Sequence, residues 1–129
     1  MKDEILPRPT DAELGILKAL WRLGPSTVRQ IKEDLDQDRE TGYTTVLKLL
    51  QIMTEKRLVE RDESQRIHVF KARLTQEQTQ QQLVDDLLQK AFSGSASQLV
   101  LRALEGKKAS ALEMAQIKDL IERLEGGDQ

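Results

Sequence analysis

The hydrophobic positions in the first part of the chain predict three helices. Apolar residues recur there every three or four positions, which is the spacing of one helix face. A capping-box sequence begins the first helix at Thr10, and Gly24-Pro25 ends it. We expect a second, short helix after Ser26, which can act as its N-cap, and a third helix over residues 43–56. The core positions expected on these helices are Leu14, Leu17, Leu20, Trp21, Val28, Ile31, Leu35, Val46, Leu49, Leu50 and Met53.

The pattern then changes to that of a β-hairpin. Residues 58–62 and 66–73 are predicted strands, and the polar residues 63–65 form the turn between them. Three helices followed by a hairpin is the element order of a winged helix. We therefore predict a winged helix-turn-helix domain over residues 1–74.

Residues 75–129 predict three further amphipathic helices. Capping-box sequences begin the first of them at Thr75 and the last at Ser110, and residues 93–95 end the first. Three helices in about 50 residues are too few to bury a core of their own, so they need a partner surface. We expect a second copy of the chain to supply it, which makes this a helical dimerisation domain in a mainly α fold. The residues expected between the subunits are Leu87, Leu101, Leu120 and Ile121.

The composition excludes several kinds of protein. The chain has no cysteine, which rules out disulfides and thiolate metal sites. Its apolar runs are far shorter than a bilayer span, and no apolar segment of the signal-peptide type follows the N-terminus. We therefore expect a cytoplasmic protein without membrane insertion.

No catalytic group of residues emerges, so we expect neither an enzyme nor a bound metal or cofactor. His68 is the one histidine, and it has no cysteine and no suitably spaced acid near it in the sequence. Asp85 and Asp86 are neighbours on a predicted helix, so they point in different directions and favour a solvated face. The glycines are isolated and form no phosphate-binding loop.

The charge distribution permits DNA as a partner. The formal net charge of the chain is −2, yet residues 41–74 hold seven Lys or Arg against four Asp or Glu. DNA affinity depends on positive charge placed near phosphates more than on the whole-chain sum. The outer face of the third helix has no acid before Glu55, which suits contact with phosphates and base edges. The residues of this face are Thr44, Thr45, Leu47, Lys48 and Gln51, and the hairpin cations are Arg61, Arg66, Lys71 and Arg73.

Two other functions stay open at this point. A winged helix can be a protein-interaction module that binds no DNA, because a fold does not dictate its ligand. A protein-binding face would more often expose large apolar groups than the polar, acid-free face described above. A small enzyme is disfavoured by the missing catalytic residues.

Several segments resemble a known family of repressors. Pro9–Val28 is similar to the first helix and turn of the penicillinase and methicillin-resistance repressors, the BlaI/MecI/CopY family. Gly42–Val59 is similar to the recognition helix of that family and its entry into the wing. The Tyr-Thr-Thr-Val sequence at 43–46 is the most specific part, and the similarity extends over about Thr10 to Leu124.

The resemblance implies a homodimeric repressor of transcription that binds inverted-repeat operators. It implies that the C-terminal helices form the dimer. It also implies that Thr44, Thr45 and Lys48 contact bases, with Leu47 and Gln51 beside them.

Two departures from the family concern induction. Copper-responsive members use cysteines near the C-terminus, and this chain has none, which excludes copper sensing. Antibiotic-responsive members are cut by a regulatory protease at an Asn-Phe bond, and the matching place here reads Arg102-Ala103. We expect such a protease to cut this bond poorly, because Ala103 leaves a pocket shaped for phenylalanine mostly empty. The partners expected are thus double-stranded DNA, a second copy of the chain and, if induction is proteolytic, a regulatory protease.

Overall fold

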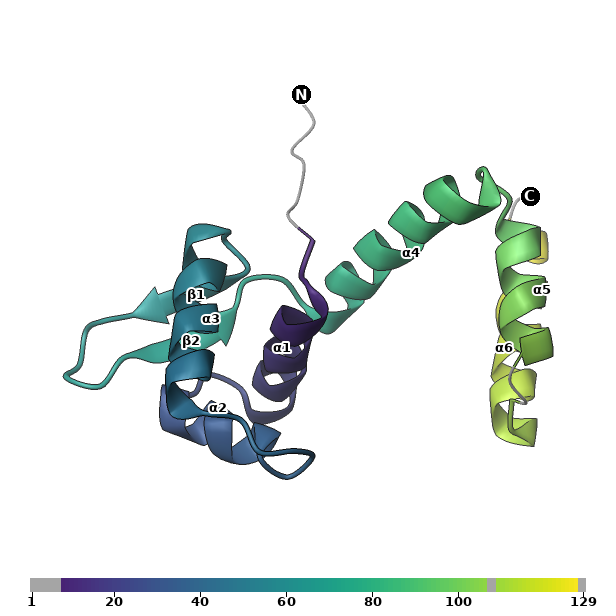
Figure 1. Cartoon of the computed structure of the whole chain (residues 1–129). Helices are drawn as coiled ribbons and strands as arrows, with labels where there is room; N and C mark the ends of the chain where they lie inside the picture. The colour runs from purple at the N-terminus through teal and green to yellow at the C-terminus, as the bar shows by residue number, and fades with distance from the viewer. Residues whose placement is uncertain (1–7, 107–108, 128–129) are drawn as a thin grey trace. The chain divides into compact units, whose positions relative to one another are not determined.

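The computed structural model describes residues 8–106 and 109–127, which form six helices and one β-hairpin (Figure 1). The predicted order of three helices, a hairpin and three further helices is confirmed, and with it the winged helix-turn-helix. The elements are α1 (Asp11–Leu23), α2 (Val28–Leu35), α3 (Tyr43–Glu55), β1 (Val59–Asp62), β2 (Val69–Ala72), α4 (Gln76–Phe92), α5 (Ala96–Gly106) and α6 (Ala111–Gly127).

Local sequence explains where α1 begins and ends. The Thr10 hydroxyl accepts a hydrogen bond from the backbone N–H of Glu13 at 3.2 Å, and the Glu13 carboxylate accepts one from the N–H of Thr10 at 2.9 Å. This is the predicted capping box. Gly24 ends the helix with a φ of 82°, a left-handed conformation that glycine adopts without a steric penalty.

The prediction that Ser26 caps α2 is wrong. Thr27 is the cap, and its hydroxyl accepts from the backbone N–H of Gln30 at 3.2 Å. Ser26 instead exchanges two backbone hydrogen bonds with Phe70, at 2.9 and 2.8 Å. The turn between α1 and α2 is therefore held against β2 as an extra bridge, a long-range pairing that local sequence does not reveal.

The core of the winged helix comes from α1, α2, α3 and the hairpin. The predicted positions Val46, Leu50 and Met53 are fully buried, whereas Leu14 and Trp21 are only partly buried. Burying one large apolar side chain contributes about 1.5–3 kcal/mol, so this cluster supplies most of the stability of the domain. Its buried members are Ile16, Leu17, Ala19, Leu20, Val28, Ile31, Val46, Leu50, Met53, Leu58, Val59 and Phe70.

The hairpin forms, but its second strand is shorter than predicted. β2 begins at Val69, so the loop between the strands covers 63–68. The Asp62 carboxylate accepts from the N–H of Ser64 at 2.9 Å, which turns the chain away from the ladder. Ile67 is 65% exposed because no cross-strand partner covers it.

The chain divides into two compact units, one ending at Asp85 and one beginning at Asp86, inside α4. The first turns of α4 belong with the winged helix. Thr79 is buried there, and the indole N–H of Trp21 donates to the carbonyl of Leu74 at 3.1 Å. The boundary expected after residue 74 stays a prediction about function.

The second unit holds the end of α4 together with α5 and α6. Ser93 and Gly94, both with positive φ, end α4, and a capping box between Ser110 and Glu113 begins α6, as predicted. None of the side chains described between residues 86 and 126 is buried. Within the described ranges, no helix combines the length and the apolar character that crossing a membrane requires. Large apolar side chains are exposed in this unit at Leu87, Val100, Leu101, Leu112, Leu120, Ile121 and Leu124.

Candidate nucleic-acid interface

The outer face of α3 is exposed and free of acids until its last residue. Thr44, Thr45, Lys48 and Gln51 are exposed. Lys48 lies three or four residues from each of the others, so its side chain neighbours theirs on the helix surface. Leu47 is half-buried and packs against the core at the edge of this face. The face therefore offers hydroxyl, amide and ammonium groups for hydrogen bonds.

A groove of about 730 Å³ lies between the start of α2, α3 and the hairpin. Three of the residues that line it are arginines, and no lining residue is acidic. The groove is therefore suited to an anion. Its lining residues are Thr27, Val28, Arg29, Tyr43, Leu47, Gln51, Arg61, Arg66, Ile67, His68 and Phe70.

The strand register explains how Arg61 reaches this groove. Arg61 pairs with Phe70 across the hairpin, and paired residues of an antiparallel ladder point to the same face. Because Phe70 points into the core, Arg61 lies on the side of the hairpin that faces the core and the groove. Its guanidinium also forms an ion pair with Glu63 at 2.6 Å.

The other cations of the hairpin differ in how they are engaged. Lys71 lies 3.5 Å from Glu60 across the ladder, and Arg73 donates to the carbonyl of Arg57 at 3.5 Å. Arg66, on the exposed loop, has no ion pair with any described residue. Arg66 is thus the hairpin cation most available to a ligand.

The structure brings together four of the seven predicted DNA-binding residues. Leu47, Gln51, Arg61 and Arg66 line the groove. The other three, Thr44, Thr45 and Lys48, lie on the exposed face of α3 and do not line it.

Sequence reasoning missed four polar residues of the groove, Thr27, Arg29, Tyr43 and His68. The residues predicted from the sequence all come from the third helix and the hairpin, and none comes from α2. A signal was available, since Arg29 lies in the first turn of α2 and Tyr43 is the first residue of α3.

Comparison with known proteins decides the family. The sequence model of the family described as penicillinase repressor matches residues 9–123. The chain belongs to the penicillinase repressor family.

Two curated relatives of this family member are named transcriptional regulator BlaI and come from two strains of Mycobacterium tuberculosis, CDC 1551 / Oshkosh and ATCC 25618 / H37Rv. Each is 32% identical over 124 residues, which is 95% of this chain and 88% of the relative. A solved structure, that of monomeric BlaI from Bacillus licheniformis in complex with the blaP half-operator, is 18% identical and has a TM-score of 0.49. The matched region covers 57% of this chain and 89% of that chain.

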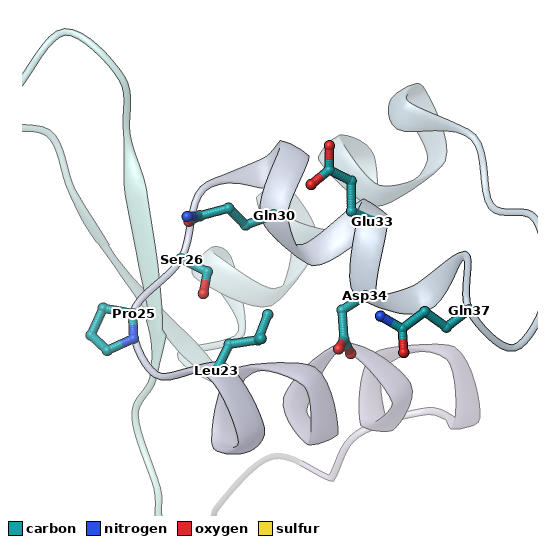
Figure 2. A pocket seen from close by; sticks show the side chains of 7 residues that line it. All are labelled: Leu23, Pro25, Ser26, Gln30, Glu33, Asp34 and Gln37. Carbon is teal, nitrogen blue, oxygen red and sulfur yellow. The ribbon is translucent and has the colours of Figure 1, made fainter.

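A second hollow on this repressor-family chain, of about 310 Å³, has a different electrostatic character. It lies where the end of α1 meets α2, and Glu33 and Asp34 line it together with Gln30 and Gln37 (Figure 2). Asp34 also forms an ion pair with Arg22, which neutralises part of the acidic charge. Carboxylates repel phosphates, so the cation-lined groove is the better candidate for a nucleic acid. In the described part of the chain, no cluster of three or more His, Cys, Asp or Glu side chains could hold a metal ion.

The four residues expected between subunits of this repressor-family chain all lie in the second unit. Leu87 is in α4, Leu101 in α5, and Leu120 and Ile121 in α6. Each side chain is between 45% and 53% exposed, so packing within one chain leaves about half of its surface uncovered.

The predicted cleavage region lies within α5. Arg102 forms an ion pair with Glu105 at 2.8 Å, and Ala103 is exposed. The bond between Arg102 and Ala103 is therefore accessible at the surface but held in helical conformation.

Proposed function

We propose that the chain represses transcription as a homodimer on an inverted-repeat operator, with one α3 in the major groove of each half-site. This member of the penicillinase repressor family is a DNA-binding transcriptional repressor. The observation that supports the placement of α3 in the major groove is its acid-free face beside a groove lined by arginines. An α-helix fits the major groove of B-DNA, where each base pair presents a distinct pattern of donors and acceptors.

Base reading is assigned to the outer face of α3. Thr44, Thr45 and Lys48 are exposed and carry groups that bond to base edges. Gln51 can bond to adenine or to a phosphate, and Leu47 supplies an apolar neighbour. Each specific contact contributes about 1–3 kcal/mol of discrimination against a wrong base.

The wing is assigned to the phosphate backbone. Arg61 and Arg66 flank the loop between β1 and β2, where their guanidinium groups can reach phosphate oxygens. Such contacts fix the position and orientation of the protein and carry little sequence information.

Dimerisation is assigned to the second unit. Its helices bury no described side chain within one chain, although they carry many large apolar residues. A two-fold interface between copies would cover them and would match the symmetry of an inverted repeat. The residues that we place in this interface are Leu87, Leu101, Leu120 and Ile121.

We assign release from DNA to loss of the dimer interface that links the two winged helices. Each winged helix alone would bind a half-site weakly. In a dimer, binding of the first winged helix raises the effective concentration of the second at the neighbouring half-site. A regulatory protease that cuts the second unit would therefore act as an inducer. A DNA partner also favours the cytoplasm as the place where the chain works.

Selection of duplexes from a random pool by the purified protein, followed by gel shifts at two salt concentrations, tests this function. We expect the recovered sequences to contain an inverted repeat and the complex to hold two chains. Affinity should fall steeply between 50 and 200 mM salt, because phosphate contacts release counterions. Recovery of no common sequence, with binding no tighter than to unrelated DNA, would instead favour a protein-interaction module.

A further inference from the structure

Two unpaired guanidinium groups line the groove from different elements. Arg29 comes from the first turn of α2, and Arg66 comes from the loop of the wing. Both are exposed, and neither forms an ion pair with a described residue. Arg61 differs, because Glu63 already neutralises part of its charge at 2.6 Å.

Other lining residues have a different chemistry. Leu47 and Ile67 are apolar, while Gln51 and Tyr43 add groups that can form hydrogen bonds. A strand of DNA combines the same two features, since anionic phosphates alternate with largely apolar deoxyribose rings. Because the lining holds cations without acids, its charge complements one such strand.

We propose that the backbone of one DNA strand lies in this groove, with Arg29 of α2 and Arg66 of the wing loop binding its phosphates. The inference rests on the proposed function and adds α2 to the interface. Thr44, Thr45 and Lys48 read bases from outside the groove, so they and Arg29 have separate tasks. The wing and α2 together hold one strand of the duplex beside the recognition helix.

The first experiment measures how the affinity of the full-length protein for its selected duplex depends on salt. Arg29→Ala and Arg66→Ala should each lower the slope of log K against log salt by about one unit. Arg61→Ala should lower it by less, because that side chain is already paired. Lys18→Ala removes an exposed cation of α1 that does not line the groove, and it should leave the slope unchanged.

Two further measurements separate a phosphate contact from other roles. Arg29→Lys keeps the positive charge and should restore most of the slope. Arg29→Ala should weaken binding to selected and unrelated duplexes by a similar factor, because a phosphate contact carries no sequence information. A loss confined to the selected duplex would overturn the proposal in favour of base reading by Arg29.

The second experiment locates the phosphates with duplexes that carry a single neutral methylphosphonate. Neutralising the phosphate that Arg29 binds should weaken DNA binding by the parent protein but not by Arg29→Ala. The same comparison applies to Arg66 and Arg66→Ala. We expect the two coupled phosphates to lie on one strand of a half-site. Coupled phosphates on opposite strands, or an Arg29→Ala variant with the affinity and slope of the parent, would overturn the proposal. Failure of the parent protein to select any sequence would instead count against the proposed function itself.

Discussion

Lys56, the C-cap of α3, donates hydrogen bonds to both carboxylate oxygens of Glu13 in the first turn of α1, at 2.8 and 2.9 Å. The side chain of Glu13 is only 3% exposed, whereas that of Lys56 is 34% exposed. Burial raises the pKa of Glu13, but hydrogen bonds from Lys56 and Thr10 outweigh it and hold that pKa below its ordinary value. The pair therefore links the recognition helix to α1, and the buried charge of Glu13 is stabilised by Lys56.

Removal of this partner should destabilise the winged helix. Lys56→Met leaves the buried Glu13 carboxylate with only the Thr10 N–H, so we expect the free energy of unfolding to fall by about 1–3 kcal/mol. Urea unfolding at about pH 7 measures it. Lys18→Met is the matched control, since Lys18 is an exposed cation of α1 without a described ion pair. Equal stabilities of the two variants would show that the ion pair contributes nothing.

The same pair predicts a dependence of stability on pH. Because the folded-state pKa of Glu13 lies below its ordinary value of 4.5, its contribution is present above that value and is lost as the pH falls through the lowered pKa. Glu13→Gln should therefore lose less stability than the parent between about pH 5 and pH 2. Parallel urea titrations of the two proteins across this range check the sign.

Truncation of the exposed polar face of α3 should weaken specific binding. Thr45→Ala and Lys48→Ala each remove a proposed base contact, which costs about 1–3 kcal/mol on the selected operator. Both side chains are exposed, so circular dichroism should stay unchanged. Glu55→Ala, at the far end of the same helix, serves as the control. Parental affinity in both variants would move base reading away from this face.

The ion pair between Arg61 and Glu63 predicts a gain of affinity. Glu63→Ala releases the Arg61 guanidinium and removes a negative charge from the wing loop. We expect tighter binding to all duplexes and a salt slope steeper by up to about one unit. Glu63→Gln keeps the size of the side chain and should behave alike. A weaker complex would mean that Glu63 orients Arg61 for its contact.

The elements of the fold were accessible from sequence because their signals are local. The capping boxes at Thr10, Thr75 and Ser110 predicted three helix starts, and each is formed as expected. The apolar spacing of Val46, Leu50 and Met53 likewise predicted the buried face of α3.

What sequence missed depends on contacts between distant residues. The local sequence predicts Ser26 as a helix cap, yet its backbone pairs with Phe70 of β2. Arg29 belongs to the candidate site because the fold places the start of α2 and the wing around the same groove. Neither relationship leaves a periodic pattern in the sequence. The base-reading and dimerisation residues remain predictions.

A chain that ends at Asp85 should fold as a monomer and bind a half-site weakly. The cut belongs there because Thr79 and the bond between Trp21 and Leu74 belong to the winged helix. Its affinity should be lower than that of the full-length protein by a factor of about 10² or more, since the two half-sites are no longer linked. Analytical ultracentrifugation and gel shifts measure both properties. A dimeric fragment would place an interface in the winged helix.

A charge in the exposed apolar face of α6 should separate the subunits without unfolding them. Leu120→Glu introduces a carboxylate at a side chain that is 45% exposed in one chain. Gln116→Glu adds the same charge at an exposed polar position of the same helix and should leave the dimer intact. Sedimentation of the two variants at equal concentration decides whether this face is buried between copies.

The bond between Arg102 and Ala103 should be a poor substrate for a sensor protease of the antibiotic-responsive type. We expect the double variant Arg102→Asn, Ala103→Phe to be cut about tenfold faster or more, because its aromatic ring fills the pocket that Ala103 leaves empty. Mass spectrometry of the fragments identifies the bond. Equal rates for parent and variant would mean that the position in α5, rather than these two side chains, governs recognition.

Leu47 belongs to two surfaces at once, because it packs against the core and also lines the groove. Thr44, Thr45, Lys48 and Gln51 are exposed and have no such double duty. Gene duplicates could therefore acquire separate operators by exchanging these four side chains at little cost in stability. Position 47 is held by folding as well as by the ligand, so we expect it to change slowly as new specificities arise.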